Sequence, residues 1–146
     1  MKKQPIFTYE NGYATCTVVD SLGRVFKGEA HCADEDRDFE SALIGGTIAE
    51  MRAQISAAKT YRDDLKIQLT ALKQLYYSMK YSNHFNPKSY EAKRLFHHIN
   101  LLNNDLDIAK HQLAVLKLDL YEYIRDKDEC HAKIRKSRNN KMLGDQ

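Results

Sequence analysis

Two long stretches of the chain carry apolar residues at alternating spacings of three and four, which defines an apolar seam. A mean period of about 3.5 residues is typical of helices that pack on other helices. Only the cations Arg62 and Lys127 interrupt it. The spacing therefore predicts two long packed helices. The seam residues are Ile48, Met51, Ile55, Ala58, Arg62, Leu65, Leu69, Leu72, Tyr76 and Met79, then Leu95, Ile99, Leu102, Leu106, Ala109, Leu113, Leu116, Leu120, Tyr123, Lys127, Cys130 and Ile134.

Composition limits the class of protein. Of the 146 residues, 42% are hydrophobic and 29% are charged, which is typical of a soluble globular or coiled-coil chain. No apolar run approaches the roughly 20 residues of a membrane helix. The lysines at positions 2 and 3 have no apolar core behind them, and three cysteines are an odd number. We therefore expect a cytoplasmic protein, and a net charge of +3 makes nucleic acid an unlikely partner.

Residues 1–32 predict a three-stranded antiparallel sheet. Asn11-Gly12 favours a type I′ hairpin turn, and the loop between Asp20 and Arg24, with Gly23 last, favours a turn with a bulge. The two turns predict registers that agree on one inward face. That face comprises Phe7, Tyr9, Ala14, Cys16, Val18, Phe26, Gly28, Ala30 and Cys32. Its small residues predict the close approach of a helix backbone.

The remaining residues predict a helical hairpin. We expect one helix over 36–81, because the acidic run at 34–36 suits a helix N-terminus, and a second helix over 88–136. Residues 82–87, which end in Pro87, predict the break between them. Residues 137–146 are expected to be a frayed basic tail. The predicted fold class is α+β, a single domain over 1–146 with a sheet followed by a coiled-coil-like antiparallel helix pair.

An antiparallel pair turning near residue 85 brings together positions whose numbers sum to roughly 171. Arg62 then lies beside Ala109, and Lys127 lies near Gly45-Gly46. These small partners leave room for long side chains. Arg62 and Lys127 could therefore set the register, reach solvent, or contact a ligand or another chain.

Charges on the helix flanks bear on assembly. Lys59, Lys66, Lys73 and Lys80 repeat every seven residues, and within a hairpin they should face Lys110 and Lys117. The aspartates at 105, 119 and 126 line the opposite flank of the second helix. The lysine stripe could pair with these aspartates of another subunit, or it could be solvated stems over the seam. We expect a homo-oligomer, a dimer or larger, because a lone hairpin leaves much apolar surface exposed.

Catalytic and metal-binding motifs are not evident. No two Cys or His residues have the spacing that presents a pair of ligands to one ion. The chain contains no nucleophile elbow, no phosphate-binding glycine loop and no paired-carboxylate motif. We expect a protein that is not an enzyme, with no catalytic residue, no metal and no cofactor.

The predicted hairpin tip is rich in aromatic and basic residues. Six of the chain's 14 Tyr and Phe residues fall within residues 76–96, among four cations. Rings that stack on a base, beside cations that pair with phosphate, are what nucleotide recognition requires. The alternative is that Tyr76 and Phe96 cap the coiled coil and the rest is a polar turn. The rings are Tyr76, Tyr77, Tyr81, Phe85, Tyr90 and Phe96, and the cations are Lys80, Lys88, Lys93 and Arg94.

Residues 18–53 resemble a family of small phage proteins. The resemblance rests on the strand Phe26 to Cys32, an acidic linker ending in Asp38-Phe39, and Gly45 leading to the segment Ile48 to Ala53. It covers about a quarter of the chain. These features resemble the anti-Thoeris family, phage sponges that sequester the cyclic ADP-ribose signal of a bacterial immune system.

The resemblance implies an oligomer, in the host cell cytoplasm if phage-encoded, that binds a cyclic ADP-ribose-like nucleotide and does not cleave it. Arg52 lies inside the matched segment, and the resemblance makes it the first candidate for a phosphate contact. Phe85, Asn86 and Arg94 are candidates by their chemistry. Two other functions stay open: a coiled-coil module that inhibits a host defence protein, and a nucleic-acid-binding protein that uses the lysine stripe and tail.

Overall fold

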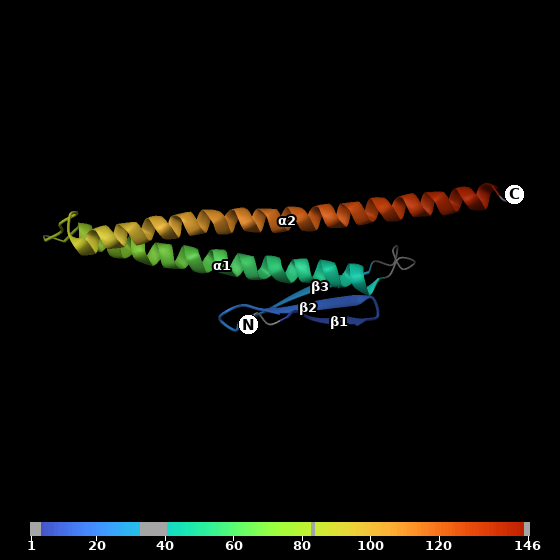
Figure 1. The fold of residues 1–146 in the computed structure, drawn as a ribbon, viewed down its shortest axis with the longest axis horizontal. Helices are drawn as coiled ribbons and strands as arrows, with labels where there is room; N and C mark the ends of the chain where they lie inside the picture. Colours follow the sequence, from blue (N-terminus) through green and yellow to red (C-terminus); the bar gives the residue numbers. More distant parts are fainter. Residues whose placement is uncertain (1–3, 33–40, 83, 145–146) are drawn as a thin grey trace. The chain divides into compact units, whose positions relative to one another are not determined.

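The computed structural model describes residues 4–32, 41–82 and 84–144. Three strands, β1 (Ile6–Glu10), β2 (Tyr13–Val19) and β3 (Val25–His31), precede two helices, α1 (Ala42–Lys80) and α2 (Tyr90–Gly144), as Figure 1 shows. The α+β class and the order of sheet and helices are confirmed. The chain divides into two compact units, residues 1–57 with 115–146 and residues 58–114.

The sheet has the register that its turns predict. The strand order is β1-β2-β3, all antiparallel, with Tyr9 opposite Ala14 and Cys16 opposite Gly28. Asn11 and Gly12 have φ of 52° and 79°, the positive values of a type I′ turn. Gly23 has φ of 80°, which closes the second turn with its bulge.

Small residues let the sheet lie directly on α1 in the first unit (Figure 1). A Cβ at Gly28 would stand 1.9 Å from the carbonyl oxygen of Ala49 and 2.5 Å from the nitrogen of Ala53. Only glycine therefore fits, and the predicted close approach of a helix is confirmed. The core around this contact consists of Ala14, Cys16, Ala30, Ile48 and Ala49, with Val18, Ile44, Leu120, Tyr123 and Ile124 packed against it.

The edge of this face is more open than its pattern predicts. Phe7 and Tyr9 belong to the inward face, yet they are 50% and 40% exposed. The Phe7 ring lies over Gly46, where an added Cβ would be 3.6 Å from it. Because β1 is the outer strand, the core closes over β2 and β3 and leaves the β1 rings half-covered.

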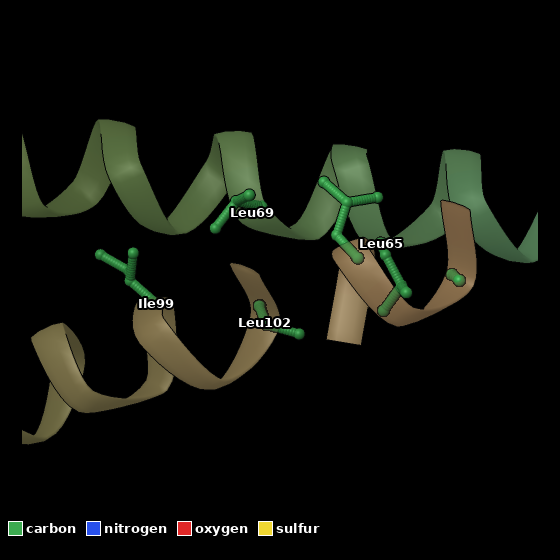
Figure 2. Close-up of a cluster of buried hydrophobic side chains, with 6 residues drawn as sticks. Leu65, Leu69, Ile99 and Leu102 are labelled. Carbon is green, nitrogen blue, oxygen red and sulfur yellow. The ribbon is translucent and has the colours of Figure 1, made fainter. Parts of the chain in front are cut away.

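The core of the second unit consists of both helices packed antiparallel. Leu65 and Leu69 of α1 meet Ile99 and Leu102 of α2, as Figure 2 shows. Leu106 and Ala109 complete the buried cluster. Leu69 and Leu102 belong to this one cluster, and their residue numbers fit the sum of roughly 171 expected from the turn position.

Helix ends differ from the predicted ones. The Ser41 hydroxyl accepts a hydrogen bond from the Ile44 amide (3.3 Å), so α1 begins after Ser41 rather than at 36. The acidic run at 34–36 lies outside the described residues. At the tip, the Ser89 hydroxyl accepts from the Ala92 amide (3.2 Å) and caps α2. At the other end α2 continues to Gly144, so the part of the tail that the structure describes, 137–144, is helical rather than frayed.

The predicted apolar seam agrees with the observed burial except near its C-terminal end. Cys130 is exposed, and His131 takes its place with 7% of its surface exposed. The seam thus steps four residues from Lys127 to His131, because a straight helix at 3.6 residues per turn drifts from a strict 3.5 repeat. Among the described helices, none is both long and apolar enough to cross a membrane.

Candidate functional site

The hairpin tip, in the second unit, carries a cluster of rings centred on Tyr76. The centre of the Phe85 ring lies 5.9 Å from the centre of the Tyr76 ring, and the two ring planes make an angle of 87°, so the rings meet edge-on. The centre of the Phe96 ring lies 6.0 Å from that of Tyr76, with an angle of 44° between the planes. Tyr77 contacts the same ring at 6.4 Å. The predicted cap of the coiled coil therefore exists, with Tyr76 half-buried at its centre.

The rings around this centre remain accessible. Phe96 is 53% exposed, Tyr90 70% and Tyr81 82%, whereas Phe85 is half-buried. Capping alone accounts for Tyr76 and for part of Phe85. It does not account for the exposed surface of Tyr90 and Phe96, and exposed rings can stack on a base.

Arg94 is held beside Tyr90 on the first turn of α2. Its Nη1 donates a hydrogen bond to the Tyr90 hydroxyl at 2.9 Å, and its guanidinium carbon lies 6.0 Å from the Tyr90 ring centre. The four-residue spacing puts both side chains on one helix face. A guanidinium has five N–H donors in a fixed fork, so this bond leaves donors for a phosphate oxygen.

Asn86 has a local structural role. Its side-chain carbonyl accepts a hydrogen bond from the Lys88 amide at 3.0 Å, and its backbone carbonyl accepts from Ser89. This arrangement is an Asx turn that leads into the Ser89 cap. A contact from Asn86 to a ligand would therefore come from its amide nitrogen. Asn83 lies outside the described residues.

Arg52 belongs to the first unit, whereas Phe85, Asn86 and Arg94 belong to the second. Its Nη1 donates to the backbone carbonyl of Glu29 at 2.7 Å, which ties α1 to β3. The structure thus gives Arg52 a packing role that its sequence position did not indicate. Its assignment as a phosphate ligand stays a prediction.

The seam cations are neutralised locally. The Arg62 side chain is 25% exposed, and its Nη2 lies 3.0 Å from Oδ1 of Asp63. The Lys127 side chain is 18% exposed, and its Nζ lies 3.1 Å from Oδ1 of Asp128. The lysines of the stripe at 59, 66, 73 and 80 are exposed along α1. Whether the stripe contacts another subunit stays a prediction.

The first unit holds a small cavity that the sequence did not reveal. Its volume is about 50 Å³, and Lys127, as predicted, shares it with Gly45. His131 and Cys32 also line it. The four-residue step from Lys127 to His131 is the signal that could have placed the histidine here.

The nucleophile and metal chemistry of the described residues is limited. Burial, reinforced by the nearby charge of Glu50, raises the pKa of the Cys16 thiol, which keeps it in the unreactive thiol form. In the ranges 4–32, 41–82 and 84–144, no group of three His, Cys, Asp or Glu side chains is arranged to hold a metal ion.

Comparison with known proteins gives no significant match to a family model, a curated protein or a solved structure.

Proposed function

We propose that this chain binds a cyclic ADP-ribose-like signalling nucleotide in the host cytoplasm and holds it intact, so that an antiviral defence loses its signal. The observation that carries the proposal is the hairpin tip, where exposed rings lie beside the oriented guanidinium of Arg94. The resemblance of residues 18–53 to the anti-Thoeris sponges supports the choice of ligand class.

The chemistry of such a ligand matches the tip. Adenine offers a flat face for stacking on Tyr90 or Phe96, a contact worth roughly 1–3 kcal/mol per base. The pyrophosphate offers anionic oxygens for Arg94, and charge-assisted hydrogen bonds of this kind are worth about 1.5–3 kcal/mol. Because Tyr90 already orients Arg94, less side-chain entropy is lost on binding.

A sponge must bind its nucleotide tightly but does not change it chemically. The test of the proposal is therefore whether the protein retains the ligand in unaltered form. A ligand bound only to the folded state, at about 100 times its Kd, stabilises the protein by about 2.7 kcal/mol. Incubation with cyclic ADP-ribose isomers should therefore raise the melting temperature by several degrees. Heating the washed complex should then release a molecule of unchanged mass.

Two results of the heating experiment would contradict the proposal. Recovery of a hydrolysed product would make the chain an enzyme. An unchanged melting temperature, with no retained nucleotide for any isomer, would remove nucleotide binding altogether.

A coiled-coil module that inhibits a host protein is the second candidate. Exposed apolar residues on the helices of the second unit favour it, since Leu101 and Ile108 lie seven residues apart on α2 and are about half exposed. This function predicts co-purification with a protein partner and no response to nucleotides. Leu101→Ser would weaken the partner complex, whereas the sponge function predicts no effect on nucleotide retention.

A further inference from the structure

The outer edge of β1 has the features of a docking strand. All five residues of β1 are exposed, and Ile6, Phe7 and Tyr9 are apolar or aromatic. Its only charge is Glu10, at the end of the strand. An exposed apolar edge strand is a template for pairing with another strand, and proteins normally protect such edges.

The opposite edge of the same sheet is protected. β3 carries Lys27 and Glu29, whose charged groups pair at 3.3 Å. In the β2–β3 ladder the pair of Glu29 and Thr15 is not hydrogen-bonded, so the backbone carbonyl of Glu29 faces outward. Arg52 donates a hydrogen bond to that carbonyl. Charged side chains and an arginine on the ladder therefore blunt β3, whereas within β1 only the terminal Glu10 is charged.

The register determines which backbone groups β1 presents at its edge. In a two-residue hairpin the flanking pair, Glu10 and Tyr13, is a hydrogen-bonded pair, and the bonded pairs then alternate along the ladder. Ile6, Thr8 and Glu10 accordingly direct their N–H and C=O groups toward β2. Phe7 and Tyr9 direct theirs to the outer edge.

An apolar groove follows the same edge. Its volume is about 320 Å³, and its lining is mainly apolar, with Phe7 and Tyr9 of β1 and Leu43 and Gly46 of α1; Glu50 of α1 also lines it. Leu43 is 79% exposed at its rim. A strand added to β1 would therefore gain burial of side chains in addition to backbone hydrogen bonds, which is how strand addition obtains specificity.

We propose that this edge pairs with the β1 edge of a second copy of the chain, antiparallel about a two-fold axis at Thr8, to give a continuous six-stranded sheet. Phe7 then lies opposite Tyr9 of the partner copy, and Tyr9 opposite Phe7, so the outward backbone groups match in both directions. An isologous interface requires this self-complementarity.

Charge also fits a second copy. In this register the two Glu10 side chains stand at opposite ends of the strand pair, four residues or roughly 13 Å apart along the strand. This separation exceeds the screening length of about 8 Å at physiological ionic strength, so the like charges do not oppose pairing. Two Thr8 residues face each other at the centre as a non-hydrogen-bonded pair.

Disulfide crosslinking tests the register. In a Cys130→Ser background, Thr8→Cys places two thiols at a Cα separation of about 4.5 Å, within the range a disulfide spans. Glu10→Cys is the matched control on the same strand, because it faces Ile6 of the other copy. Under mild oxidation Thr8→Cys should form covalent dimer at least about tenfold faster than Glu10→Cys. Equal rates would overturn the proposal.

Light scattering after size exclusion tests the edge without crosslinking. The wild-type chain should have the mass of a dimer or a multiple of it. Phe7→Pro removes an outward N–H and a groove ring, and proline is tolerated where the N–H of an edge strand faces away from the sheet. This variant should keep its circular dichroism spectrum and lose half its mass. A monomeric wild type, a Phe7→Pro variant with unchanged mass, or Thr8→Cys crosslinked to a different protein would each overturn the proposal.

Discussion

At Gly28 the absence of one carbon atom decides whether the sheet can lie on α1. In Gly28→Ala the new Cβ would meet backbone atoms of Ala49 and Ala53, which cannot rotate away. Overpacking of this kind costs about 1–3 kcal/mol or more. The melting temperature of Gly28→Ala should therefore fall by several degrees in a calorimetric scan.

Gly46→Ala is the matched control for that substitution. Its Cβ would meet the Phe7 ring at an ordinary 3.6 Å, and the position lies inside a helix, where alanine is favoured over glycine by up to about 1 kcal/mol. Gly46→Ala should leave the melting temperature unchanged or raise it. Equal losses for both variants would refute the close approach at Gly28.

Asp20 makes the second hairpin sensitive to acid. Desolvation opposes the charged form, but hydrogen bonds from the Arg24 side chain and from the Arg24 and Leu22 amides outweigh it and lower the pKa of Asp20. A lowered folded-state pKa adds stability above the ordinary value, and this stability disappears as the pH falls through the folded value. The advantage of wild type over Asp20→Asn in urea unfolding should therefore be present at pH 7 and shrink progressively as the pH falls below the ordinary Asp pKa of about 3.9. A difference that persists unchanged at low pH would contradict this role.

At the scale of the elements, the seam of α1 and α2 separates core from surface. Leu69 is 5% exposed and contacts α2, whereas Ile67, two residues away, is 68% exposed. Leu69→Ala should cost about 2–5 kcal/mol of unfolding free energy, because it leaves a cavity between the helices. Ile67→Ala should change stability by less than about 0.5 kcal/mol. A reversed order of the two losses, measured by denaturant titration, would mean that the seam is misassigned.

Element types and strand registers could be predicted because each depends on local signals. Asn11-Gly12 specifies the first turn, and the three- and four-residue spacing specifies the helix faces. Helix ends could not be predicted equally well, since an acidic run at 34–36 and a serine at 41 both favour a helix start. The tail at 137–144 lacks an apolar face, so its sequence predicts fraying where the structure has helix.

The candidate site was only partly predictable for a related reason. A cluster of aromatic and basic residues at the tip is visible from their spacing. The Arg94–Tyr90 bond could be anticipated from the four-residue interval. The bond from Arg52 to Glu29 joins residues 23 positions apart and depends on how the sheet lies on α1, so no local pattern indicates it.

For the whole molecule, the charge distribution bears on which polyanions can compete for binding. The net charge is +3, and the lysines at 59, 66, 73 and 80 stand on a single helix face. A nucleic-acid-binding protein with 6–10 phosphate contacts loses roughly 10³–10⁵ in affinity between 50 and 200 mM salt. We expect at most weak binding to a fluorescent duplex at 50 mM salt, and none at 200 mM. Saturable binding that persists at 200 mM and falls steeply at higher salt would instead support the nucleic-acid function.

The most direct test of nucleotide binding at the tip is isothermal titration calorimetry with cyclic ADP-ribose isomers. It compares the wild type, Arg94→Gln and Lys133→Gln, the last a matched loss of one exposed cation on the same helix. Wild type should bind with measurable heat. Arg94→Gln should weaken binding at least about tenfold, because a charge-assisted bond worth about 1.5–3 kcal/mol exceeds the roughly 1.4 kcal/mol of a tenfold change. Lys133→Gln should change binding less than about twofold. No heat with wild type, or equal affinity for Arg94→Gln and wild type, would contradict the account.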